Sequence, residues 1–188
     1  MGSMDVKALY KFTSGLYVVS THDGDAVSAC LINTGLQLTS TPLQVQVAVN
    51  KGNYTEGMIE KSGTFALTLV SETADMPYIG RFGFRTSRDF DKFDGIAVER
   101  TILGDPYTTE HAVAMLACEV VQKLDVGTHM LFVGEVKEAV SVADAAVIVV
   151  NCKSGLDTCT DILKTISKSV SKFNISRRYT IVFIFICC

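Results

Sequence analysis

The hydrophobic positions along the first three-quarters of the chain follow the short alternating pattern of β-strands rather than the spacing of long helices. The run 44–49 (QVQVAV) alternates polar and apolar residues at period two, as a half-buried strand does. The DGD at 23–25 predicts a hairpin turn between two apolar runs. The other predicted strands are 16–20, 26–31, 65–70, 115–123 and 130–136, and helical patterns cover only 54–61 and 75–81.

Many short strands with few helices predict a mainly β fold, a closed barrel more than a layered α/β sheet. With 188 residues, 48% hydrophobic and 20% charged, the chain suits one globular domain with a real core. The net charge of −3 provides no basic field for nucleic acid. The longest apolar run, IVFIFICC at 181–188, is far below the roughly 20 residues of a membrane span, so we expect no membrane partner.

The cysteine pattern indicates free thiols rather than a disulfide framework. Six cysteines occur without a secretory signal and without a CxxC pair, which predicts a reducing, cytoplasmic location and no metal site. Cys30 and Cys118 fall inside strand patterns and are expected to be buried packing residues.

The composition changes near residue 144. Residues 1–144 carry 11 basic and 18 acidic side chains, whereas residues 145–188 carry 6 basic and 2 acidic ones. The tail also has a helical apolar spacing between the strand-like runs 145–150 and 179–186. It is interpreted as a strand–helix–strand addition to the barrel, or equally as an altered reading frame or expression artefact. The opening MGSM resembles a vector-derived leader and is set apart.

The stretch NKGNYTE at 50–56 lies where a predicted strand turns into a helix. Asn53 is a good helix N-cap, Glu56 completes a capping box, and Gly63 suits the helix end. Capping alone does not account for Lys51 or Thr55. A helix N-terminus that has a cation and a hydroxyl beside it also suits a phosphate group, which is the second interpretation. From the residues alone, the two interpretations have about equal weight.

Three segments in order resemble the flavin reductase-like family: KFTSGLYVVST, INTGLQLTSTPLQVQVAVNKGNYT and GTHMLFVGEV. The resemblance covers roughly residues 5–143 and is most similar to the branch with flavoredoxin and the flavin domain of high-molecular-weight rubredoxin. Its most specific pieces are NT-x-x-Q-x-T-S-x-P and N-K-x-N-x-T. It leaves 144–188 unmatched.

The resemblance implies a six-stranded Greek-key split barrel that forms a homodimer and binds FMN rather than FAD. It also implies NAD(P)H as a transient co-substrate and a rubredoxin-like acceptor as a possible partner. No catalytic side chain is expected, because the flavin carries out the redox chemistry. The family pattern places Asn33, Thr34 and Gln37 along the flavin ring and ribityl chain, Asn50 at the turn, and Ser40, Lys51, Asn53 and Thr55 around the phosphate.

Other residues have two interpretations each. His129 faces the flavin and the nicotinamide, or makes a structural bond at a strand start. Three arginines, at 81, 85 and 88, bind a nucleotide pyrophosphate, or pair with the nearby aspartates 89, 91 and 94, which we favour. His22 is expected to be solvated. Phe82 and Phe84 cover the flavin or belong to the core, and Gly35 stands where relatives carry larger residues.

The predicted function is an NAD(P)H-dependent flavin reductase that passes electrons to flavin, a rubredoxin-like carrier or a ferric substrate. The alternative is an FMN-binding electron carrier that does not react with nicotinamide, since no GxGxxG motif is present. A third hypothesis is that the tail prevents folding, so that the chain is an inactive product.

Overall fold

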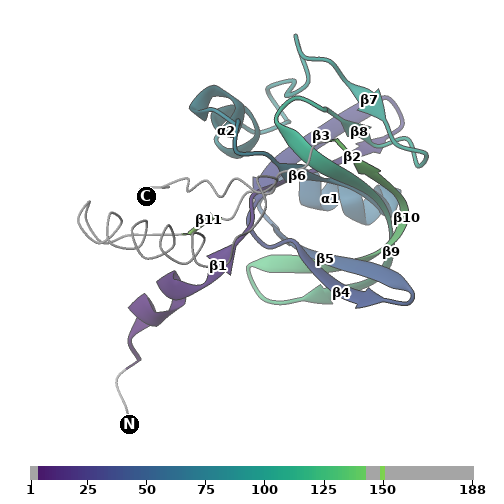
Figure 1. Cartoon of the computed structure of the whole chain (residues 1–188). Coiled ribbons are helices and arrows are strands. Elements are labelled where there is room, and N and C mark those ends of the chain that lie inside the picture. Colours follow the sequence, from purple (N-terminus) through teal and green to yellow (C-terminus); the bar gives the residue numbers. More distant parts are fainter. Residues whose placement is uncertain (1–3, 143–148, 151–188) are drawn as a thin grey trace, which may run out of the picture.

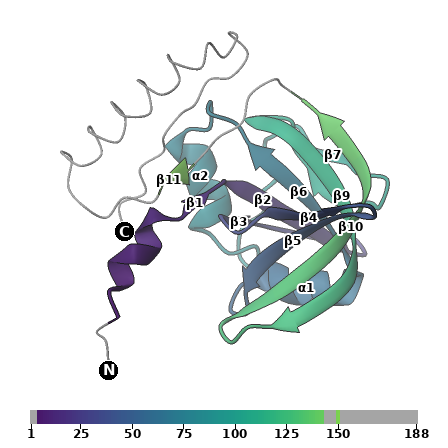
Figure 2. The ribbon, with the colours of Figure 1, turned by 60° about the horizontal axis from the view of Figure 1, so that its bottom comes forward.

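A computed structural model describes residues 4–142 and 149–150 of the chain. Its main body is one antiparallel sheet of seven strands in the order β3-β2-β6-β9-β10-β5-β4, which curls around a core (Figures 1 and 2). The strands are β2 (Tyr17–Asp23), β3 (Ala26–Ile32), β4 (Leu36–Ser40), β5 (Leu43–Asn50), β6 (Thr64–Val70), β9 (Ala112–Asp125) and β10 (His129–Ser141).

Six of these strands coincide with the runs that the sequence pattern predicts, and β4 is an addition. The sheet therefore has seven strands where six were expected. Among the described residues, β4 pairs only with β5 and forms one edge of the sheet, and all five of its residues are exposed. Leu36 to Thr39 alternate apolar and polar side chains, a short strand signal that the flanking polar residues Asn33, Thr34, Ser40 and Thr41 obscure.

The core lies inside the curled sheet. In β5, Val45, Val47 and Val49 are buried and alternate with more exposed residues, as the polar–apolar alternation predicted. They share one cluster with the fully buried rings of Phe65 in β6 and Phe132 in β10. Burial of such side chains stabilises the fold by about 1.5–3 kcal/mol each.

Two helices confirm the predicted helical segments. Helix α1 (Tyr54–Ser62) follows the N-cap Asn53 and ends at Gly63, whose φ of 71° is left-handed. It packs against β2 and β3. Helix α2 (Met76–Gly83) begins after Asp75, whose carboxylate accepts from the Tyr78 backbone N–H, and packs on β3.

The remaining described elements are small. The 3-10 helix η1 (Val6–Lys11) projects away from the barrel (Figure 1), and β1 (Thr13–Ser14) pairs with β11 (Val149–Val150). Strands β7 (Glu99–Arg100) and β8 (Pro106–Tyr107) form a short antiparallel pair. The predicted tail helix and the strand 179–186 lie outside the described residues. Among the described helices, none has the length and apolar character to cross a bilayer.

Candidate functional site

The NKGNYTE stretch forms the turn between β5 and α1. The Asn53 side-chain oxygen accepts from the Thr55 backbone N–H at 3.1 Å, which confirms the N-cap. In a capping box the Glu56 side chain would accept from the Asn53 backbone N–H. Here that N–H donates instead to the Asn50 carbonyl at 2.9 Å. The Asn50 side-chain oxygen accepts from the Gly52 N–H at 2.8 Å. Both asparagines thus use their oxygens locally, and no bond of either side-chain NH₂ group is found within the described residues.

Lys51 forms an ion pair across the turn. Its Nζ lies 2.6 Å from Oδ1 of Asp125, at the end of β9, and its backbone N–H donates to the Thr128 carbonyl at 3.1 Å. The bond from Lys51, followed by one from the Gly127 N–H, lowers the pKa of Asp125. Lys51 therefore already holds an anionic group beside the start of α1. Asp125 is 74 positions away from Lys51 in the sequence, so no local pattern links the two residues.

His129 belongs to the same corner of the molecule. It is the first residue of β10 and pairs directly with Asn50 of β5. Its Nδ1 lies 2.8 Å from the Thr128 hydroxyl, and the residue is half-buried. This bond fits the structural interpretation of His129, while its place opposite Asn50 keeps it adjacent to the predicted cofactor residues.

The loop before β4 reaches toward this corner through Thr34. Its hydroxyl donates to the Ala48 carbonyl at 2.9 Å and accepts from the Ala48 N–H at 3.3 Å, two residues before Asn50. Asn33 next to it is exposed. The Gln37 amide in β4 donates to the Thr39 carbonyl at 3.3 Å. The Thr34 side chain thus fastens the loop to β5 and leaves Asn33 at the surface.

Within one chain, two of the residues predicted to surround the phosphate, Thr55 and Ser40, do not lie with the side chains of the β5–α1 turn. The Thr55 side chain is completely buried, and its hydroxyl lies 2.8 Å from the Ser28 hydroxyl in β3. Ser40 pairs with Leu43 at the opposite end of the β4–β5 hairpin. The seven steps from Leu43 to Asn50 correspond to roughly 24 Å of strand.

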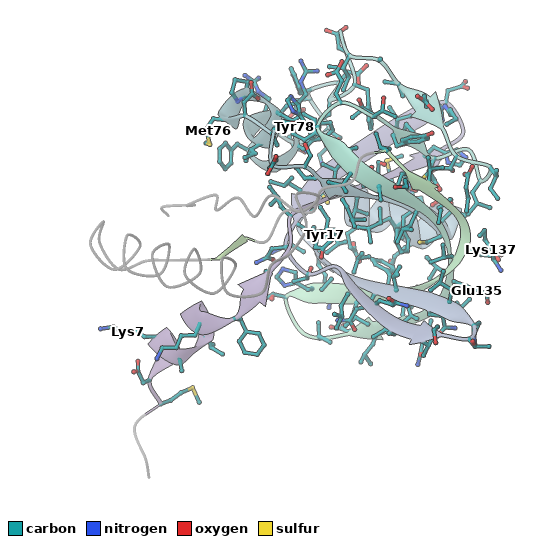
Figure 3. All side chains as sticks on the ribbon, viewed as in Figure 1. Lys7, Tyr17, Met76, Tyr78, Glu135 and Lys137 are labelled. Carbon is teal, nitrogen blue, oxygen red and sulfur yellow. The ribbon has the colours of Figure 1, made fainter. Side chains whose placement is uncertain are left out.

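Tyr17 explains the small residue at Gly35. The ring of Tyr17 (Figure 3) lies so close that a Cβ added at Gly35 would be 3.0 Å from three of its atoms. A Cβ at Gly15 would lie 2.3 Å from the Tyr17 hydroxyl oxygen. Burial raises the pKa of Tyr17 above its ordinary value. The ring thus occupies the space beside the Asn33–Gly35 loop that a larger residue at 35 would take.

Arg81, in the last turn of α2, and Arg85 and Arg88, which follow the helix, make no carboxylate pairs among the described residues, so the favoured pairing with aspartates 89, 91 and 94 is wrong there. Arg81 donates to the carbonyls of Lys92 at 3.2 Å and Asp94 at 2.6 Å. The Arg85 and Arg88 guanidinium carbons lie 4.6 Å and 5.3 Å from the ring centroids of Phe90 and Tyr54, respectively. Phe82 is fully buried in the core, whereas Phe84 is 72% exposed.

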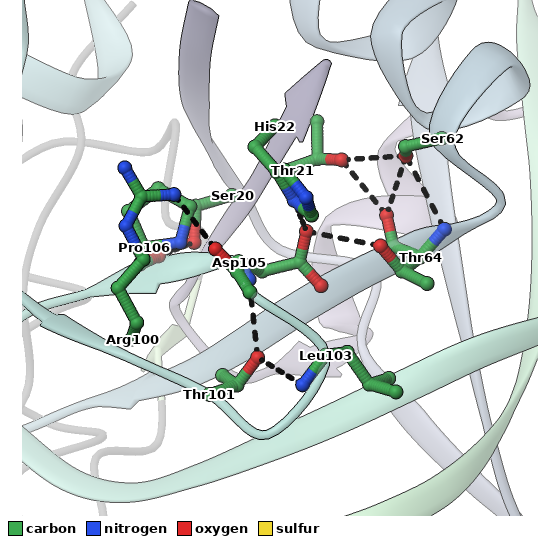
Figure 4. A network of polar contacts seen from close by, with 11 residues as sticks. Ser20, Thr21, His22, Ser62, Thr64, Arg100, Thr101, Leu103, Asp105 and Pro106 are labelled. Carbon is green, nitrogen blue, oxygen red and sulfur yellow. Dashed lines mark hydrogen bonds and ion pairs between the residues drawn. The ribbon is translucent and has the colours of Figure 1, made fainter. Parts of the chain in front are cut away.

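A second polar cluster joins β2 to the loop before β8 (Figure 4). Asp105 is fully buried, and its Oδ1 lies 2.8 Å from His22 Nδ1 and accepts from the Thr64 hydroxyl at 3.0 Å. Its Oδ2 has no partner among the described residues. Burial raises the pKa of Asp105, although the bonds from His22 and Thr64 act in the opposite direction. His22 is therefore bound, not simply solvated as expected.

The part of the chain that the structure describes contains no group of three or more His, Cys, Asp or Glu side chains that could hold an ion. Cys30 and Cys118 are buried free thiols, as expected, and burial raises their pKa values to about 11 and about 12. A thiol that stays protonated is a poor nucleophile and metal ligand, which fits their packing role.

Comparison with known families identifies one domain model. The model described as "Flavin reductase like domain" matches residues 9–158. The match covers all the site residues above and extends past the expected boundary at residue 143.

Two relatives have substantial sequence identity. A ferric-chelate reductase (NAD(P)H) of Archaeoglobus fulgidus is 43% identical over 145 residues, which cover 77% of this chain and 86% of that protein. A high molecular weight rubredoxin of Moorella thermoacetica is 37% identical over 136 residues, which cover 72% of this chain. The matched part spans only 59% of the rubredoxin's own length.

Solved structures agree on the fold. Nitrilotriacetate monooxygenase component B from Mycobacterium thermoresistibile superposes with a TM-score of 0.64 at 26% identity, covering 71% of this chain and 72% of that one. Flavoredoxin from Methanosarcina acetivorans superposes with a TM-score of 0.63 at 22% identity, covering 69% of each chain. The mainly β split-barrel fold is thereby confirmed.

Proposed function

Because this chain belongs to the flavin reductase-like family, we propose that it is an FMN-binding oxidoreductase that accepts hydride from NADH or NADPH. The observation that carries the proposal is its 43% identity, over most of both chains, to a protein named as a ferric-chelate reductase that uses NAD(P)H. A free flavin, a ferric chelate or a rubredoxin-like protein would receive the electrons. The rubredoxin relative supports the last of these acceptors.

The donor groups around the β5–α1 turn fit a flavin phosphate. Lys51 brings a positive charge that already binds a carboxylate, and the Asn50 and Asn53 side-chain NH₂ groups add donors next to a helix N-terminus. The buried Thr55 hydroxyl contributes indirectly, by fixing α1 against Ser28 of β3. Bound FMN would supply the redox chemistry, and the protein supplies binding, orientation and shielding.

The flavin ring would lie along the loop from Asn33 to Gln37. Thr34 holds this loop on β5 through both polar groups of Ala48, which anchors the backbone next to the exposed Asn33. Gln37 on β4 is also exposed. Amide side chains can donate to and accept from the carbonyl and nitrogen edge of a flavin. His129 borders this region from the β10 side, because it pairs with Asn50.

Replacing Lys51 with alanine is expected to weaken FMN binding about tenfold or more, because a hydrogen bond to a charged group contributes roughly 1.5–3 kcal/mol. Asp125→Asn is expected to strengthen binding several-fold, because it removes the carboxylate that competes for Lys51. Quenching of FMN fluorescence on titration of flavin-free protein measures both.

Lys123→Ala is the matched control for Lys51→Ala. Lys123 lies on the same strand as Asp125 and forms a surface ion pair with Glu60 at 2.8 Å. Its removal changes the net charge equally but leaves the turn intact. Equal FMN affinity in the Lys51 and Lys123 variants would disprove the phosphate role of Lys51.

The hydride reaction has a direct test. FMN-loaded protein is mixed with NADH or NADPH in an anaerobic stopped-flow instrument, and loss of the visible flavin bands is followed. We expect bleaching with at least one donor. Bleaching by a reduced rubredoxin or ferredoxin but by neither nucleotide would instead establish the electron-carrier alternative, which the identity to the rubredoxin relative favours.

We further propose that the protein is a homodimer that uses the β4 edge. Leu36, Leu38 and Leu43 are 58%, 42% and 39% exposed on the β4–β5 hairpin. An uncovered apolar edge strand is a site for association. Leu36→Lys is expected to convert a dimer to a monomer in light scattering after size-exclusion chromatography, and a parent protein that is monomeric at micromolar concentration would refute the proposal.

A further inference from the structure

An open cavity of about 710 Å³ lies between α2 and the segment that follows it. Its lining consists of Pro77, Gly80, Arg81, Phe84, Arg85 and Phe90. Two of these six residues are cationic and none is acidic, although Asp89 and Asp91 flank Phe90 in the sequence. The volume is within the range of about 300–1,000 Å³ that is typical of small-molecule sites.

The two arginines differ in how far their guanidinium N–H groups are already bonded within the protein. Arg81 is half-buried, and its Nη1 is held by the carbonyls of Lys92 and Asp94. Arg85 is exposed and stacks on Phe90, with its guanidinium carbon 4.6 Å from the ring centroid. Stacking occupies the face of a guanidinium and leaves its N–H edges able to donate in pairs. Within the described residues, neither arginine has a carboxylate partner.

Phe84 adds a flat apolar surface beside these charges. Its side chain is 72% exposed, whereas the neighbouring Phe82 is completely buried. An exposed aromatic ring next to an arginine edge suits a ligand that carries both a planar ring and a phosphate. Nucleotides combine these two groups.

The cavity is connected to the proposed flavin region through β3. A Cβ added at Gly83 would lie 3.3 Å from Leu31, which is two residues before Asn33. The Ser87 hydroxyl is bonded to both backbone groups of Ala29, at 3.2 and 3.3 Å. Arg88 stacks on Tyr54, the first residue of α1. The segment 83–88 therefore contacts both β3 and the start of α1, the two elements that border the predicted flavin residues.

We propose that this cavity binds the adenosine diphosphate half of the nicotinamide donor, with Arg85 on the phosphates and Phe84 against the adenine ring. The inference rests on the proposed function, because it assigns a second subsite to the same donor. The nicotinamide would then extend past Leu31 toward the Asn33 loop.

The test uses ADP-ribose, which contains this half and no nicotinamide. Isothermal titration of the full chain with ADP-ribose is expected to show binding that weakens about tenfold or more in Arg85→Gln, as the loss of a paired charge-assisted bond implies. Arg100→Gln is the matched control, because Arg100 is also exposed but bonds the Gly104 carbonyl away from the cavity. Phe84→Ala is expected to weaken binding several-fold.

A kinetic measurement separates binding from chemistry. In anaerobic stopped flow, Arg85→Gln is expected to raise the nucleotide concentration for half-maximal flavin reduction about tenfold and to leave the limiting rate within about twofold. The proposal is overturned if the parent does not bind ADP-ribose, or if Arg85→Gln binds it as tightly as Arg100→Gln does. Absence of flavin reduction by either nucleotide would refute the proposed function instead, since the ADP-ribose titration does not depend on the flavin.

Discussion

Replacing Gly134 with alanine is expected to lower the free energy of unfolding by about 2 kcal/mol, within the range of overpacked cores. Gly134 is buried in β10, next to an irregularity in the pairing with β9. An added Cβ would lie 2.7 Å from both Cys118 Cβ and the tip of the Phe65 ring. Cys118 is held by the strand backbone and Phe65 is completely buried, so neither can move away without disturbing the core.

Urea unfolding followed by circular dichroism measures this effect, and Gly57→Ala is the matched control. Gly57 lies inside α1, has no atom within 4 Å of an added Cβ and does not have a positive φ. Its replacement is expected to raise stability by up to about 1 kcal/mol, since alanine favours helix. Equal stability changes in the two variants would show that contacts at Gly134 do not limit the core.

Asp105→Ala is expected to cost about 3 kcal/mol of stability. The substitution removes the acceptor for both His22 and Thr64 and leaves their polar atoms partly buried without partners. Asp105→Asn is the matched variant, because the amide oxygen can still accept both bonds. Thermal or urea unfolding of the two variants at neutral pH should therefore give a clearly smaller loss for asparagine than for alanine.

The pH dependence gives a second measurement on the same residue. The pKa of Asp105 in the folded protein is above its ordinary value of 3.8, so folding favours the protonated carboxyl group. The stabilisation is complete below 3.8 and is lost as pH rises through the raised pKa. Asp105→Asn lacks this titration, and its stability relative to the parent should rise across this interval. A fall over the same interval would contradict the proposed burial effect.

The fold was largely predictable because its strands carry buried faces. Alternation in β5 and the capping residues of α1 both act over a few neighbouring positions, which a sequence displays directly. Strand β4 is an exposed edge that pairs with β5, and its period-two alternation covers only Leu36 to Thr39, which is a weaker signal than the one in β5.

The candidate site was predictable in part, for a related reason. The turn 50–53 is local and was identified, but the partners of its side chains come from distant strands. Lys51 meets Asp125, and the Thr55 hydroxyl turns inward to Ser28 because of the face of α1 on which it lies. His22 was expected to be solvated, since nothing near it in the sequence indicates its contact with Asp105, 83 positions later.

The placement of Tyr17 between Gly15 and Gly35 links three positions that are separate in the sequence. A side chain at Gly35 would require the Tyr17 ring to move slightly, and a side chain at Gly15 would require a larger movement of the same ring. The effects of substitutions at these positions are therefore interdependent, because each of them depends on the place of the Tyr17 ring. A smaller residue at position 17 in β2 would therefore widen the choice of residues at position 35, in the loop beside the proposed flavin ring.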